Sequence, residues 1–103
     1  MRVDDLADVR AGDKGDHLML AVVPRGDEAW TVLRERLTAD AVGRHFGPAV
    51  TGPVDRHELP GLPALLFRIP GVLAGGVTGS LTLDGHGKTL SYHLLTLEID
   101  DGS

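Results

Sequence analysis

The 103-residue sequence contains no cysteine, which excludes disulfide bonds and metal sites built from thiolates. Aromatic residues make up only 4% of the chain, so leucine, valine and alanine must supply the core. No stretch approaches the roughly 20 apolar residues of a membrane-spanning helix. The N-terminus carries acids where a signal peptide needs bases, so we expect a cytoplasmic protein with no membrane contact.

Basic residues are not in excess either. The formal net charge is -5, which argues against a nucleic-acid binder, because such a protein needs a basic face for phosphates. The hydrophobic fraction of 42% and the charged fraction of 24% are ordinary for a globular protein. The length predicts one domain over residues 1–103 with a single core.

Hydrophobic patterning defines the first half of the chain. The apolar run at 17–24 predicts a buried central strand, and the shorter pattern at 3–9 predicts an edge strand before it. Apolar residues then recur at helical spacing over 27–46, with Asp27 as the expected N-cap. Thr38 is a second capping residue inside that segment. The pattern therefore fits either one broken helix or two in sequence.

The second half contains two further predicted strands and an ambiguous tail. Residues 50–58 and 62–69 are predicted as strands, and the short connection between them predicts an antiparallel pair. Residues 89–100 fit either a helix that ends in a strand or the second arm of a long hairpin. Pattern alone leaves both open.

A run of glycine, aspartate and basic residues lies between the two N-terminal apolar stretches. Its glycines let backbone amides approach an anion, while Arg10 and Lys14 supply positive charge. Its spacing is not that of a P-loop. The alternative is a polar connection between two strands. The candidates for ligand binding or docking in this run are Arg10, Gly12, Asp13, Lys14, Gly15 and Asp16.

A second glycine-rich stretch lies near the other end of the chain. If a helix begins near Lys88, the amides before it point toward a phosphate or carboxylate. The alternative is a solvated surface loop. The candidates in this stretch are Gly75, Gly76, Ser80, Asp84, Gly87 and Lys88.

Few residues are placed for catalysis. The five histidines show no recurring metal-ligand spacing, so we expect no metal site and no cofactor. Ser80 lacks the G-x-S-x-G surroundings of a hydrolase nucleophile. Lys14 and His86 are the candidates for an acid or base, although a histidine in a glycine loop is more often simply solvated.

Taken together, these stretches resemble the C-terminal domain of the AtuA family, the acyclic terpene utilisation proteins. The resemblance runs from Leu6 to Ile99 and so covers almost the whole chain. Each stretch alone is a weak signature of the family. Their order and spacing together are a specific one. The residues that carry it are Arg10–Asp16, Glu58-Leu59-Pro60, Gly75-Gly76-Val77, Ser80-Leu81, Asp84 and Gly87-Lys88.

The resemblance implies an α+β, ferredoxin-like βαββαβ sandwich. It favours a helix after Gly87-Lys88, which makes residues 96–100 the last strand. Two helices would cover one face of the sheet and leave the other for a partner or dimer mate. The implied elements are strands at 17–24, 50–58, 62–69 and 96–100, helices at 27–46 and 87–95, and an added N-terminal edge strand at 3–9.

This chain departs from the family pattern in three places. The family tends to have asparagine after the Gly-Asp-Lys-Gly stretch, where this chain has Leu18-Met19-Leu20. A Ser-Leu-Arg run is Ser80-Leu81-Thr82 here, and an asparagine in a later strand is replaced by Leu65-Leu66. The loss of three polar groups weakens the case for an inherited ligand site or active site.

The resemblance also implies a setting. In the family this module follows a larger domain or occurs beside it as a separate small protein, in gene sets for acyl-CoA and terpenoid catabolism. We therefore expect a non-catalytic small subunit that docks on a larger AtuA-type N-terminal-domain protein through its glycine loops.

Two alternatives stay open. One is an enzyme, or half an enzyme, that acts on an acyl-CoA thioester with Lys14 or His86 as acid or base, and with Gly75–Lys88 holding phosphate or thioester oxygen. The other is a stand-alone homodimer that binds a small acid through the unpaired sheet face. For the isolated chain we do not expect enzymatic activity.

Overall fold

In the part of the chain that the structure describes, four antiparallel strands form one sheet in the order β1-β2-β4-β3. The computed structural model describes residues 1–14, 17–71 and 90–99. The strands are β1 (Ala7–Lys14), β2 (His17–Pro24), β3 (Asp55–Glu58) and β4 (Leu65–Pro70). The predicted central strand at 17–24 is confirmed, and so is the antiparallel pairing of the two strands that follow the helical segment.

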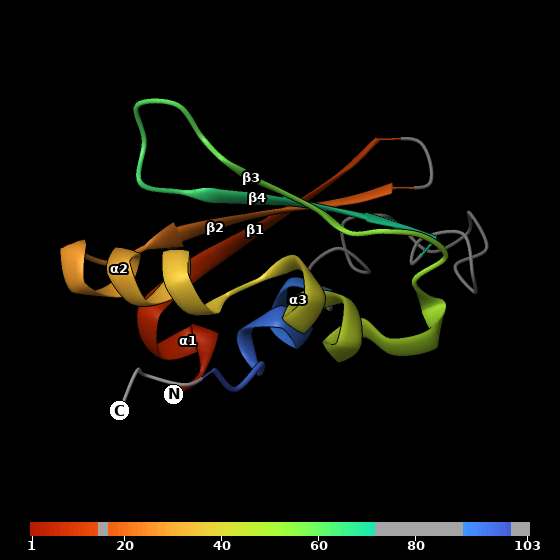
Figure 1. Ribbon diagram of the computed structural model, residues 1–103, viewed down its shortest axis with the longest axis horizontal. Coiled ribbons are helices and arrows are strands. Elements are labelled where there is room, and N and C mark those ends of the chain that lie inside the picture. Colours follow the sequence, from red (N-terminus) through yellow and green to blue (C-terminus); the bar gives the residue numbers. More distant parts are fainter. Residues whose placement is uncertain (15–16, 72–89, 100–103) are drawn as a thin grey trace.

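The described helices all lie on one side of this sheet (Figure 1). Residues 90–95, drawn in blue, are helical as well and lie in the same layer. The expected start of that helix at residue 87 lies outside the described residues. The named helical elements are α1 (Val3–Leu6), α2 (Asp27–Arg36), α3 (Ala39–Phe46) and the 3-10 turn η1 (Gly47–Ala49).

Period-two alternation along β2 and β4 builds the core between sheet and helices. Alternate residues of both strands are buried, because one face of each strand is turned toward the helices. The helices add apolar residues such as Leu33 and Val42, and Leu37 follows the end of α2; all three have no exposed surface. The buried strand residues are Leu18, Leu20, Val22, Leu65, Phe67 and Ile69.

The helical segment 27–46 consists of two helices. Thr38 separates them and caps the second, since its hydroxyl accepts a hydrogen bond from the Ala41 amide at 3.0 Å. The expected N-cap role of Asp27 is wrong by one residue. Asp27 is the first helical residue, and the N-cap is Gly26 with φ of +147°, a value that favours glycine.

The N-terminal prediction is wrong in part. A strand was expected at 3–9, but residues 3–6 form the one-turn helix α1, and the strand begins at Ala7. Val3 and Leu6 are both buried on the same side of that turn, at helical spacing. The strand that follows does lie at an edge of the sheet, beside β2, as expected.

The C-terminal strand expected at 96–100 is absent from the described residues. Only an isolated bridge forms there, between Glu98 and Arg2. The place beside β2 is taken by β1.

Strand β3 is shorter than the predicted 50–58, because Gly52 and Pro53 interrupt pairing before Asp55. With these corrections the α+β class and the ferredoxin-like layout are confirmed.

Candidate functional site

The face of the sheet opposite the helices is covered by no described element (Figure 1). We call it the open face. Strand alternation assigns to it the side chains that point away from the buried ones. The open face consists of Asp8, Arg10 and Gly12 on β1, His17, Met19, Ala21 and Val23 on β2, Leu66, Arg68 and Pro70 on β4, and Asp55 and His57 on β3.

The centre of the open face is apolar. Met19, Ala21 and Leu66 are half-buried, and Val23 is 40% exposed. Ala21 is opposite Leu66 in the register of β2 and β4, so these side chains adjoin each other on the two inner strands. The sheet thus presents an apolar strip that none of the described helices covers.

Charged groups lie at both edges of that strip. Arg10 on β1 and Asp55 on β3 are exposed, and none of the described ion pairs involves either of them. Asp8 differs, because Arg25 donates to its carboxylate at 2.8 Å. This hydrogen bond raises the pKa of the Arg25 guanidinium above its usual value.

A hollow of about 350 Å³ opens at one corner of this face, where β2 begins and β4 ends. Within it the Arg68 Nε–H donates to His17 Nδ1 at 2.6 Å, across the two inner strands. His17 Nδ1 is therefore an acceptor and carries no proton. The lining residues are His17, Thr51, Gly52, Pro53, Asp55, Arg68 and Pro70.

The first predicted motif is not a loop throughout. Residues 10–14 belong to β1 and pair along β2 up to Lys14 opposite His17. The glycine at 12 leaves open space beside Met19 and does not shape a turn. Gly15 and Asp16 connect the two strands but lie outside the described residues. The backbone of Asp13 and Lys14 therefore runs in a strand next to the hollow.

The second motif lies outside the described residues altogether. Its proposed roles in binding, and that of His86 as an acid or base, stay predictions. The residues concerned are Gly75, Gly76, Ser80, Asp84, His86, Gly87 and Lys88.

In the described ranges no three histidine, aspartate or glutamate side chains gather closely enough to hold a metal ion. No helix in those ranges is long and apolar enough to cross a bilayer.

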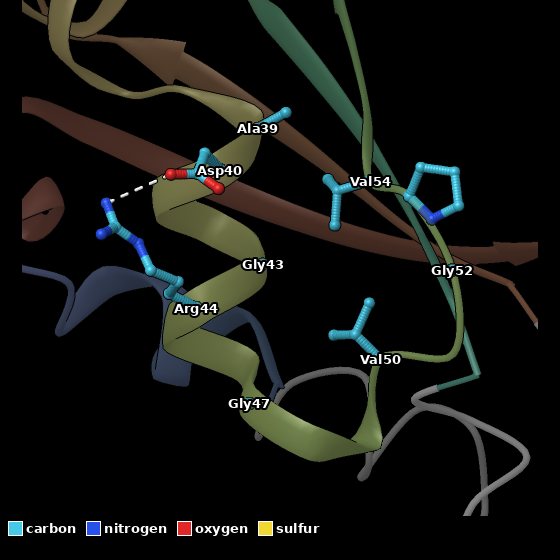
Figure 2. Close-up of a pocket in the computed structure, with 9 residues that line it drawn as sticks. Ala39, Asp40, Gly43, Arg44, Gly47, Val50, Gly52 and Val54 are labelled. Carbon is cyan, nitrogen blue, oxygen red and sulfur yellow. Dashed lines mark ion pairs between the residues drawn. The ribbon is translucent and has the colours of Figure 1, made fainter.

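A second hollow, of about 530 Å³, lies between α3 and residues 50–54 (Figure 2). Val50 and Val54 point toward α3, on which Gly43 has no side chain to fill the space, and Gly47 follows the end of that helix. The charged residues at its border, Asp40 and Arg44, are paired with each other at 3.4 Å. This hollow therefore presents apolar walls and a charged pair that is already neutralised.

Arg68 and His17 were missed as site residues at the level of sequence. A signal was present, because Arg68 is the one charged residue inside the apolar strand LLFRIP. An arginine between Phe67 and Ile69, which are both fully buried, must point to the other face of the sheet.

A model of the AtuA ferredoxin-like domain matches residues 1–100 of the chain. The chain belongs to this family. No curated protein and no solved structure gives a significant match. The family assignment agrees with the four-stranded antiparallel sheet covered by helices on one face.

The structure shows where the two stretches lie at which the family resemblance led us to expect an asparagine. In this AtuA ferredoxin-like domain Leu18, Leu20 and Leu65 are buried in the core, whereas Met19 and Leu66 lie on the open face. An asparagine in the core is costly because it loses water without gaining partners. In these two stretches an asparagine would therefore fit best in place of Met19 or Leu66, which lie at the centre of the open face.

Proposed function

We propose that this AtuA ferredoxin-like domain is a non-catalytic binding module that docks through its open face on a larger AtuA-type protein. The observation that carries the proposal is the apolar strip of Met19, Ala21, Val23 and Leu66 on a sheet face that no described element covers. A contiguous apolar surface of this kind is typical of an interaction site.

The charges around the strip support the same function. Stable interfaces have an apolar centre and a polar rim, and the open face has Arg10 at one edge with Asp55 and His57 at the other. Rim charges set the orientation of a partner and speed its association. The partner surface would present an acidic group toward β1 and a basic group toward β3.

Catalysis on an acyl-CoA thioester stays the alternative. It depends on Lys14 or His86 and on residues 75–88, of which the structure describes only the Lys14 backbone. On the described part of the open face, apolar side chains stand at Met19 and Leu66, which offer neither a proton nor a hydrogen bond. The binding function needs no such group. The cytoplasmic location also stays a prediction.

The test is binding of the full chain to the large AtuA-type domain of the same organism, measured by titration calorimetry. Met19→Asp and Leu66→Asp each place a charge in the strip, and we expect each to weaken binding by about tenfold or more. Tyr92→Asp is the matched control, because Tyr92 is 64% exposed and belongs to the helical layer. It should bind like the unchanged chain.

Two results would contradict the docking function. One is equal binding by the control and the two strip variants, with thermal unfolding showing that all three are folded. The other is turnover of an acyl-CoA by the isolated chain that is abolished by Lys14→Ala, which would establish the enzyme instead.

A further inference from the structure

The half-buried guanidinium of Arg68 lacks a described carboxylate partner. Its strand, β4, is an inner strand of the sheet, and Arg68 points from it into the corner hollow. None of the ion pairs formed by the described side chains includes Arg68. The other arginine with a similarly shielded side chain, Arg56, donates to two backbone carbonyls. Arg68 instead donates to a histidine nitrogen.

This hydrogen bond fixes how Arg68 presents its remaining donors. The Nε–H is used by His17 Nδ1 at 2.6 Å, which holds the guanidinium plane in place. The two terminal nitrogens remain, and they form the fork that matches the two oxygens of a carboxylate. We propose that the corner hollow is a binding site for a small carboxylic acid, held by Arg68. This inference does not depend on the docking function.

Two further lining residues indicate which acids fit. Asp55 is opposite Arg68 in the register of β3 and β4, and Thr51 lies at the side of the hollow with a hydroxyl group. Asp55 repels any carboxylate that enters the hollow, and a ligand with two carboxylates most strongly, whereas it can accept a hydrogen bond from a hydroxyl group. The site therefore selects a monocarboxylate with a hydroxyl group over a dicarboxylate or a plain fatty acid.

The size and place of the hollow suit this ligand class. Its volume of about 350 Å³ is at the small end of ligand pockets, which are roughly 300–1,000 Å³. It also adjoins the first sequence motif, because Lys14 is registered opposite His17. The described part of the motif that was expected to bind a ligand thus runs beside a site made by residues outside the motif.

The test is titration of the full ¹⁵N-labelled chain with 3-hydroxybutyrate, butyrate and succinate, followed by NMR. We expect saturable shifts of the Arg68 Nε–H and of the Thr51 and Asp55 amides with 3-hydroxybutyrate, with a Kd of about 1 mM. Butyrate should bind several-fold more weakly, and succinate more weakly still.

Variants separate the site from general charge effects. Arg68→Gln and Arg68→Lys should each weaken binding about tenfold or more, and the lysine variant preserves the charge in case the glutamine variant does not fold. Arg10→Gln, on the same face, should bind like the unchanged chain. Asp55→Asn should bind butyrate more tightly and lose the preference for the hydroxyl group.

Three results would overturn the proposal. They are the absence of saturable shifts up to about 10 mM acid, equal binding by the folded Arg68→Lys variant, and equal loss in the Arg10→Gln variant. All of these measurements use the chain alone, so a failure here leaves the docking function untouched. A failure to dock likewise leaves this site untouched.

Discussion

The rings of His45 and His93 stack on each other, and each ring is also hydrogen-bonded to the backbone carbonyl of the other residue. Their rings stack with centroids 4.1 Å apart and an angle of 14° between planes. His45 Nε2 lies 2.7 Å from the His93 carbonyl oxygen, and His93 Nε2 lies 3.0 Å from the His45 carbonyl oxygen. Both Nε2 atoms therefore carry a proton and donate it. This reciprocal pair joins the end of α3 to the helical residues 90–95.

Loss of this pair should loosen the C-terminal helix. His93→Ala removes the stack and one hydrogen bond, and it leaves the His45 carbonyl without its donor. We expect the free energy of unfolding to fall by about 1–3 kcal/mol, measured by chemical denaturation. Tyr92→Ala, one residue away and 64% exposed, is the control and should change it by less than about 0.5 kcal/mol. Equal effects would show that the pair contributes nothing.

Arg56 stabilises the end of α2 from strand β3. It donates to the carbonyl oxygens of Leu37 at 2.9 Å and Arg34 at 2.6 Å, two groups that the helix itself leaves unpaired. Arg56→Ala should lower the free energy of unfolding by about 1–3 kcal/mol, because two carbonyls lose a charged donor. Arg36→Ala removes an exposed arginine from the same helix and should be nearly neutral. A neutral Arg56→Ala would contradict this account.

Gly71 is required for two separate reasons. Its φ of +90° strains any other residue, and a Cβ there would clash with the Thr51 side chain. Gly47 has only the first restriction, with φ of +71° and open space. We expect Gly71→Ala to cost more than about 2 kcal/mol and Gly47→Ala about 1 kcal/mol, measured by thermal unfolding.

A double-mutant cycle isolates the clash at Gly71. Thr51→Gly removes the atoms that the new Cβ meets, so Gly71→Ala should cost less in that background. If its cost is the same in both backgrounds, backbone strain alone explains the effect.

Neighbouring residues of β2 test which face is open. Leu18 is 1% exposed and points to the helices, whereas Met19 lies on the open face. Leu18→Asn should cost more than about 3 kcal/mol, because it removes core packing and buries an amide. Met19→Asn should cost less than about 1 kcal/mol. A large cost at Met19 would mean that the open face is covered within the chain.

The sequence predicted the elements whose pattern is determined by core burial. The run at 17–24 and the helical spacing over 27–46 follow from which residues must face the core, so both are confirmed. The helix α1 has no such signal, because a single turn is unstable alone. It is held by long-range contacts, such as the Val3 amide donating to the Leu97 carbonyl at 3.0 Å.

The candidate site was predicted less well than the fold. Glycine at 12 indicates a loop, yet the strand pairing of β1 with β2 outweighs that preference at a sheet edge. The contact of Arg68 with His17 joins residues that are 51 positions apart. Only the register of two inner strands brings them together, and no local pattern encodes that register.

The two ends of the described chain are joined to each other. The Met1 ammonium group lies 3.2 Å from the Ile99 carbonyl oxygen, and the Ile99 amide donates to the Met1 carbonyl at 2.7 Å. Residues 1 and 99 are thus hydrogen-bonded neighbours, and they lie on the side of the molecule away from the open face (Figure 1). The order of elements could therefore be permuted, with residue 99 linked to residue 1 and new ends at the exposed turn near Leu62.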